Sequence, residues 1–168
     1  MPLIDEGRKA PAFTLSDQNG ERHALKDYLG RPVVLYFYPK DDTSGCTKEA
    51  CQFRDAMPNF EKLDAVVFGI SPDDEKSHAK FAQKHGLNFT LLCDPPKKKR
   101  DAPEDDKGTP KVCEKYGVWQ EKSMYGRSYM GVVRTTYLID VNGKVAKRWD
   151  KVKVPGHADA VLEAVKAL

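Results

Sequence analysis

The chain has 168 residues, of which 40% are hydrophobic, and its formal net charge at pH 7 is +3. This length suits one domain with a full core, and so mild a charge gives no reason to expect a nucleic-acid partner. No apolar run approaches the roughly 20 residues that a membrane helix needs, and the first residues lack the apolar core of a secretion signal.

The first half of the chain predicts two buried strands joined by a helix. The runs at 33–38 and 65–70, VVLYFY and AVVFGI, are rich in β-branched and aromatic residues, as is typical of strands that are buried on both faces. Between them, residues from about Cys46 to Leu63 are predicted to form a helix. The unit is therefore strand, helix, strand, with a right-handed crossover.

A second helix is predicted to follow the second strand. Ser71-Pro72-Asp73-Asp74 offers an N-cap, a proline for the first helical position and acidic residues for the first turn. The helical spacing continues until Gly86, and Phe89 to Leu92 then forms a short third strand. We interpret His78 and His85, which share one face of this helix, as ordinary surface or boundary residues.

The last part of the chain predicts a hairpin and a closing helix. Arg134 to Ile139 and Val145 to Trp149 flank an Asn-Gly turn, and His157 to Leu168 has the pattern of an amphipathic helix. This order of elements predicts an α/β fold with a central mixed β-sheet flanked by helices, for which a thioredoxin-like fold is the natural candidate.

The segment from Pro95 to Lys111, PPKKKRDAPEDDKGTPK, interrupts this order. It has no bulky apolar residue and cannot bury enough surface to offset the entropy lost on ordering. We therefore expect a single domain over residues 1–168 that carries a mobile, charged, proline-rich loop at about 95–111. An alternative is that Lys97 to Arg100 bind an acidic partner.

Cys46 and Cys51 lie at the start of the first predicted helix. The turn-forming stretch Thr43-Ser44-Gly45 places the Cys46 sulfur in the first turn, where unpaired backbone N–H groups and the helix dipole favour an anion. Helix N-termini lower the pKa of a thiol and so increase the amount of thiolate, which is the nucleophile. Four cysteines in a chain without an export signal indicate reduced, reactive thiols and a cytoplasmic protein.

The spacing of these two cysteines is unfavourable for a disulfide within a helix. Five residues along an α-helix separate the Cα atoms by about 8.6 Å, whereas a disulfide needs Cα atoms within about 7 Å. Cys46 and Cys51 can therefore pair only if part of the helix unwinds. The pair suits a cycle between a reactive helical state and an oxidised, locally unfolded state.

Other site chemistries fit the sequence less well. Zinc is disfavoured because no C-x-x-C pair is present, and neither phosphate-binding glycine motif occurs, so no metal or cofactor is expected. A Cys–His hydrolase stays open, because sequence spacing does not locate the four histidines relative to Cys46.

Pro39, Thr43 and Cys46 match the P-x-x-x-T-x-x-C pattern of the peroxiredoxin active site. The surrounding FYPKDDTSGCTKEACQFRD resembles the bacterioferritin comigratory protein, or peroxiredoxin Q, subfamily, and the likeness continues in APAFTL, VVFGISPDD, YGVW and GVVRTTYLID. The loop at 95–111 is the main exception. The resemblance implies a thioredoxin-dependent peroxidase that reduces hydrogen peroxide and organic hydroperoxides, without a bound cofactor, in redox homeostasis and antioxidant defence.

The resemblance also implies roles for individual residues. Cys46 would attack the peroxide and become a sulfenic acid, and Cys51 would resolve it as an intramolecular disulfide that thioredoxin or another dithiol reduces. Thr43 would hydrogen-bond the peroxide, and Pro39 would shield the thiolate from water. Arg134 would stabilise the thiolate and the charge on the reacting oxygens.

Three features depart from the subfamily pattern. Ser44 stands where proline is common, Cys93 stands where serine is usual, and Cys113 is additional; each extra cysteine is either a bystander or a second resolving residue. Two other function classes stay open, a redox-sensing interaction module and a binder of nucleic acid or of an acidic partner through the 97–100 cations. We expect a monomer, with a dimer as the alternative.

Overall fold

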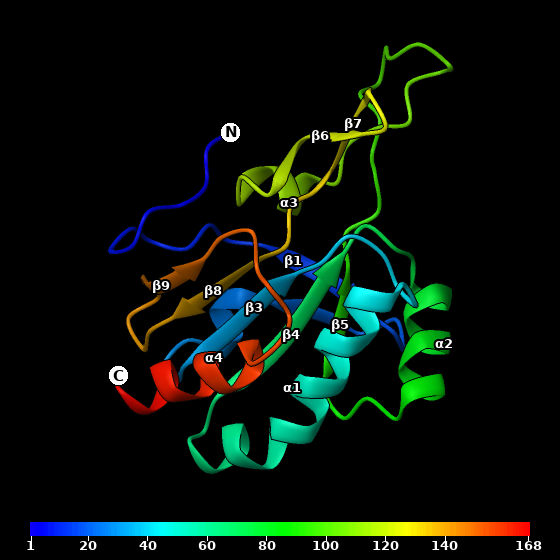
Figure 1. The fold of residues 1–168 in the computed structure, drawn as a ribbon. Helices are drawn as coiled ribbons and strands as arrows, with labels where there is room; N and C mark the ends of the chain where they lie inside the picture. Colours follow the sequence, from blue (N-terminus) through cyan, green and yellow to red (C-terminus); the bar gives the residue numbers. More distant parts are fainter.

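A seven-stranded mixed sheet forms the centre of the computed structural model, which describes residues 1–168 (Figure 1). Its strands are β1 (Thr14–Asp17), β2 (Arg22–Ala24), β3 (Val33–Phe37), β4 (Val66–Ser71), β5 (Thr90–Cys93), β8 (Thr135–Ile139) and β9 (Val145–Trp149). Their order across the sheet is β2-β1-β5-β4-β3-β8-β9. The three central strands β5, β4 and β3 run parallel, and the flanking strands are antiparallel to their neighbours.

Helices and a separate hairpin complete the structure. The helices are α1 (Ser44–Lys62), α2 (Glu75–His85), α3 (Lys111–Lys115), α4 (His157–Lys166) and the short 3-10 helix η1 (Leu25–Tyr28). The hairpin consists of β6 (Trp119–Met124) and β7 (Arg127–Val132), which pair only with each other. None of the helices combines the length and the apolar character needed to cross a membrane.

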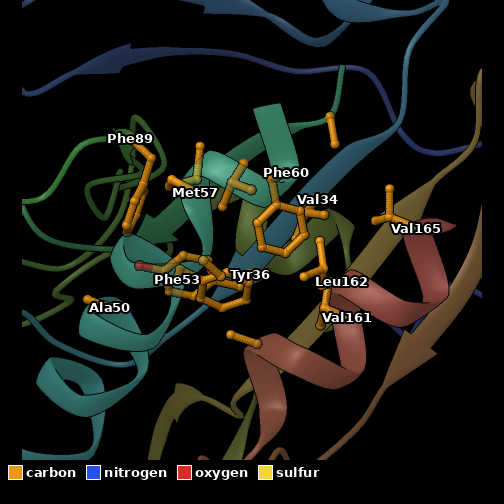
Figure 2. Close-up of a cluster of buried hydrophobic side chains, with 14 of the residues drawn as sticks. Val34, Tyr36, Ala50, Phe53, Met57, Phe60, Phe89, Val161, Leu162 and Val165 are labelled. Carbon is orange, nitrogen blue, oxygen red and sulfur yellow. The ribbon is translucent and has the colours of Figure 1, made fainter. Parts of the chain in front are cut away.

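Strand β3 is buried on both faces and separates two hydrophobic clusters. Val34 and Tyr36 belong to the cluster beneath α1 and α4, whereas Leu35 and Phe37 belong to the cluster on the other face. Figure 2 shows aromatic side chains of α1 packed between β3 and the apolar side chains of α4. Each large apolar side chain buried in this way contributes roughly 1.5–3 kcal/mol. Packing on both faces therefore fixes the position of the C-terminal end of β3, from which the loop and α1 continue.

The first predicted helix is confirmed, and the start of the second was predicted wrongly. Helix α1 begins two residues before Cys46, with Thr43 as its N-cap. Ser71 is not a cap, because it extends β4 and pairs with Cys93. Asp74 caps α2 instead, and its side chain accepts a hydrogen bond from the Ser77 backbone at 2.8 Å.

The interpretation of His78 as a surface or boundary residue is also wrong. Its side chain is 0% exposed and contacts the loop that leads into α1. Helical spacing alone did not reveal this, because the partner of His78 lies 37 residues earlier in the chain.

The charged segment at 95–111 follows β5 and contains no strand or helix before α3 begins at its last residue. Its base is closed by two backbone hydrogen bonds between Lys97 and Thr109, of 2.9 and 3.0 Å. Figure 1 shows the segment extending away from the sheet. It lies beyond the C-terminal end of β5, on the side of the sheet where the parallel strands end.

Candidate active site

Cys46 lies in the first turn of α1, the helix that follows β3 along the chain. It is the third residue of the helix and is 2% exposed. The Arg134 Nη2 atom donates to the Cys46 sulfur at 3.3 Å. A helix N-terminus and a guanidinium both interact favourably with an anion, and the Cys46 sulfur lies beside both.

Sheet pairing explains how Arg134 reaches Cys46. Strand β8 runs antiparallel to β3, with Thr135 opposite Phe37. Arg134 directly precedes β8, so it lies over the end of β3 and beside the start of α1. Gly45 leaves room for this approach, because a Cβ atom at that position would lie 3.1 Å from Arg134 Nη2.

The same guanidinium binds a buried carboxylate. Arg134 Nη1 donates to Glu49 Oε1 at 2.7 Å, so the two arms of the arginine contact residues three apart on one face of α1. Glu49 is 0% exposed, and its second oxygen has no hydrogen-bond partner. Burial raises the pKa of Glu49 to about 7 although Arg134 opposes the shift, so this carboxyl is partly protonated near neutral pH.

Thr43 and Pro39 lie on the loop between β3 and α1. The Thr43 side chain is exposed, and its hydroxyl donates to the Lys40 carbonyl at 2.9 Å rather than to Cys46. Pro39 is half-buried immediately after the buried Tyr38. Both residues are near Cys46 in the chain, but neither hydrogen-bonds to its sulfur.

Cys51 lies in the same unbroken helix as Cys46. It is half-buried, and all four cysteines are free thiols. In regular helical geometry its Cα atom is about 8.6 Å from that of Cys46, which is too far for a disulfide. Burial raises the pKa of Cys113 well above its ordinary value, and this residue packs in the cluster on the opposite face of the sheet.

Two residues at the site escaped prediction. Glu49 stands three residues after Cys46, so the helical spacing could have identified it. Lys122 carried no signal in the sequence. Its ammonium donates to the Val132 carbonyl at 3.0 Å, and burial and the charge of Arg134 lower its pKa while Cys46 opposes the shift. The β6–β7 hairpin thus carries a second cation whose pKa responds to the charges at this site.

No histidine serves as a base for Cys46. The imidazole of each hydrogen-bonds elsewhere: His23 with Asp17, His78 with Asp41, His85 with Asp42 and His157 with Thr136. A cysteine hydrolase needs a histidine within hydrogen-bond reach of its nucleophile. The arrangement therefore does not support the Cys–His hydrolase alternative.

Comparison with known proteins gives consistent matches over nearly the whole chain. A model of the AhpC/TSA family matches residues 7–148. Peroxiredoxin Bcp of Bacillus subtilis is 45% identical, over 97% of this chain and 96% of that protein. Peroxiredoxin Bcp of Escherichia coli is 44% identical, over 99% and 98% of the two chains.

Solved structures show the same likeness. The bacterioferritin comigratory protein of Xanthomonas campestris, studied for its alkyl peroxide reduction activity, superposes with a TM-score of 0.82 at 39% identity, covering 97% of this chain and 98% of that one. A PrxQ mutant of Xylella fastidiosa superposes with a TM-score of 0.85 at 34% identity, covering 99% and 98%. These superpositions confirm the predicted thioredoxin-like arrangement of a mixed sheet flanked by helices.

Proposed function

The chain belongs to the AhpC/TSA family and is a thiol-dependent peroxiredoxin of the Bcp type, and we propose that Cys46 is the residue that attacks the peroxide. The observation that carries this assignment is the contact of 3.3 Å between Arg134 Nη2 and the Cys46 sulfur at a helix N-terminus. Of the four cysteines, Cys46 alone has a guanidinium as a hydrogen-bond partner.

The first step is a displacement at oxygen. The Cys46 thiolate donates an electron pair to one peroxide oxygen, the O–O bond breaks, and the second oxygen leaves as water or an alcohol after taking up a proton. Sulfur is oxidised to a sulfenic acid, and the peroxide is reduced. Arg134 supports the step because its guanidinium stabilises the thiolate and can donate to the oxygens on which charge develops.

Thr43 and Pro39 have supporting roles in this proposal. The Thr43 hydroxyl, which now donates to the Lys40 carbonyl, would turn toward the peroxide when it binds beside Cys46. The half-buried Pro39 has no N–H group and presents an apolar ring, which would limit the access of water to the thiolate. The position of both residues on the loop before α1 supports these roles.

Cys51 is the proposed resolving cysteine. Its thiol attacks the Cys46 sulfenic acid, a sulfur–sulfur bond forms and water leaves. The first turns of α1 must unwind for this step, since the helical separation of the two residues exceeds disulfide geometry. Thioredoxin or another dithiol then reduces the disulfide. The proposed substrates are hydrogen peroxide and organic hydroperoxides. The proposed enzyme is cytoplasmic and monomeric.

Catalytic turnover distinguishes this proposal from a redox-sensing module. Oxidation of thioredoxin should require both peroxide and the protein, and the Cys46→Ser variant should show none, because a serine hydroxyl offers almost no anion at neutral pH. Turnover that persists in Cys46→Ser at the wild-type rate would refute the assignment. Binding of nucleic acid that weakens with salt and depends on the 97–100 cations would favour the other alternative instead.

A further inference from the structure

A buried acid–histidine pair lies against the loop that leads into the active-site helix. Asp41 occupies this loop between Pro39 and Thr43, and its side chain is buried. The His78 Nδ1 atom lies 2.7 Å from Asp41 Oδ2. Helix α2, which carries His78, is therefore joined through the interior to the segment that positions Cys46.

The partners of the imidazole determine its charge. Nδ1 faces the Asp41 carboxylate, and Nε2 lies 2.9 Å from the Leu92 carbonyl, which can only accept a hydrogen bond. Both ring nitrogens therefore donate, and His78 is an imidazolium. Burial disfavours this charge, but the hydrogen bond and attraction of Asp41, with help from Cys93, outweigh it and raise the pKa of His78 to about 10.

The Asp41 carboxylate holds further groups besides His78. It accepts from the Tyr38 hydroxyl at 2.6 Å and from the Ser77 hydroxyl at 2.7 Å. The Asp41 backbone N–H donates to Asp73 Oδ2 at 2.8 Å. One residue of the loop is thus tied to the end of β3, to α2 and to the turn between β4 and α2.

These contacts leave no role for a metal ion at this cluster. Asp41, Asp73 and His78 lie close enough together to suggest a cation site. However, a histidine that donates from both nitrogens has no lone pair for a metal. The carboxylates are likewise engaged by hydroxyl and backbone donors, so the cluster is internally satisfied.

We propose that His78 is a positioning residue for the peroxidase reaction: through Asp41 it fixes the loop before Thr43, and so confines the unwinding required by Cys46 and Cys51 to α1 itself. The inference rests on the proposed roles of these two cysteines. Loss of one partner would leave the other as an unpaired buried charge, which is strongly unfavourable. The anchor therefore holds through the unwinding of the adjacent helix.

The neighbouring residue has only exposed side-chain contacts. Asp42 has a backbone φ of +60°, a left-handed conformation that is uncommon outside glycine but that aspartate adopts more readily than most residues. Its carboxylate pairs with Lys84 at 2.8 Å and with His85 at 3.2 Å, but these contacts are exposed. Exposed ion pairs contribute little, so the buried contact of Asp41 carries most of the restraint.

The test replaces His78 by glutamine and measures the reduced protein. Amide hydrogen exchange at residues 41–46 should accelerate by about tenfold or more, because the loop opens locally without global unfolding. The second-order rate constant for peroxide should fall by about fivefold or more, since misplacing a catalytic group lowers the rate. A merely structural role would lower the melting temperature and leave both quantities unchanged.

His23→Gln is the matched control. His23 forms another acid–histidine contact that is largely shielded from solvent, with its Nε2 atom 2.7 Å from Asp17 Oδ2, but it lies on β2 at the edge of the sheet. Its replacement removes a histidine–aspartate contact from a different part of the fold. Loop exchange and peroxide rate should stay within about twofold of the wild type, as expected for a distant, independent site.

Rescue and a wild-type measurement complete the test. The double variant Asp41→Asn/His78→Gln leaves no unpaired buried charge, so its loop exchange should lie nearer the wild type than that of His78→Gln. If the variants do not fold, nitrogen-15 NMR of the wild type decides. The His78 ring should keep both protons after peroxide treatment has oxidised Cys46 and Cys51.

Three outcomes would overturn the inference: unchanged loop exchange in His78→Gln, equal effects in His23→Gln, or loss of a ring proton from His78 on oxidation. Failure of the proposed function would look different. In that case the wild type would not reduce peroxide, yet the exchange comparison in the reduced protein would still decide whether His78 anchors the loop.

Discussion

The Arg134 guanidinium donates to the Cys46 sulfur at 3.3 Å although 88 residues separate the two in the chain. Antiparallel pairing of β8 with β3 sets Arg134 beside the start of α1, and the other arm of the guanidinium is held by the buried Glu49 at 2.7 Å. Because Glu49 holds the guanidinium in place, Arg134 is positioned in advance for the peroxide step that we propose at Cys46.

Replacement of Arg134 should therefore slow the peroxide step. Arg134→Ala removes the cation that favours the thiolate, and the second-order rate constant should fall by at least about tenfold, equivalent to roughly 1.4 kcal/mol. Arg134→Lys should recover only part of this loss, because an ammonium cannot present the two-armed geometry to both Glu49 and Cys46. An unchanged rate constant for Arg134→Ala in stopped flow would show that the contact is not used.

Cys51→Ser should separate the two halves of the reaction. The first, peroxide-consuming step should remain, but the sulfenic acid on Cys46 should accumulate, react with a dimedone-type reagent and over-oxidise readily. Turnover with a dithiol donor should fall, whereas Cys93→Ser and Cys113→Ser should change little because both residues are buried. A disulfide from Cys46 to Cys93 or Cys113 in the Cys51→Ser protein would move the resolving role to that residue.

Glu49 should give the peroxide rate a dependence on pH near neutrality. Burial raises the pKa of Glu49 to about 7, so a negative charge develops near the thiolate as the pH rises through that value. Glu49→Gln removes this titration and keeps an acceptor for Arg134. The ratio of the variant rate constant to the wild-type one should therefore increase between about pH 6 and pH 8. A ratio that stays constant over this range would contradict the assigned charge.

His157 should make stability depend on pH in the acid range. Burial and the charge of Arg134 lower the pKa of His157 to about 4, whereas an unfolded histidine has a pKa of about 6.5. Between these values the unfolded state binds the proton and the native state does not. The contribution of His157 is thus complete above about pH 6.5 and is lost as the pH falls through 4.

Comparison with His157→Gln isolates this effect. The free energy of unfolding of the wild type minus that of the variant should fall by about 3 kcal/mol between pH 7 and pH 4. Chemical denaturation at a series of pH values measures this difference. A difference independent of pH would mean that the native state protonates His157 as readily as the unfolded chain does.

The sequence predicted the central strands well because burial on both faces leaves a clear apolar pattern, as in VVLYFY at 33–38. The β6–β7 hairpin was missed because its strands, WQEKSM and RSYMGV, show no sustained apolar face. These strands pair only with each other. Most of their residues do not pack in a core, so their sequences do not need the alternating apolar pattern by which a strand is predicted.

Local sequence predicted part of the site, but it did not predict the contacts that depend on the tertiary fold. The position of Cys46 at a helix start followed from local residues, since turn formers precede it and helix formers follow it. The proximity of Arg134 to Cys46 came from the resemblance to peroxiredoxins, because sheet register is not visible in local sequence. Asp41 and His78 were not paired in advance, because their contact depends on how α2 packs against the loop.

The central claim is that Cys46 and Cys51 form the redox pair of this peroxiredoxin through unwinding at the start of α1. Its most direct test is to oxidise the wild type with one equivalent of hydrogen peroxide, map the disulfide by mass spectrometry and compare amide exchange with the reduced protein. The account predicts one intramolecular Cys46–Cys51 bond and faster exchange between Cys46 and Phe53, because helical geometry keeps the two Cα atoms about 8.6 Å apart. A Cys46 bond to Cys93 or Cys113, or a Cys46–Cys51 bond with helical protection retained, would contradict it.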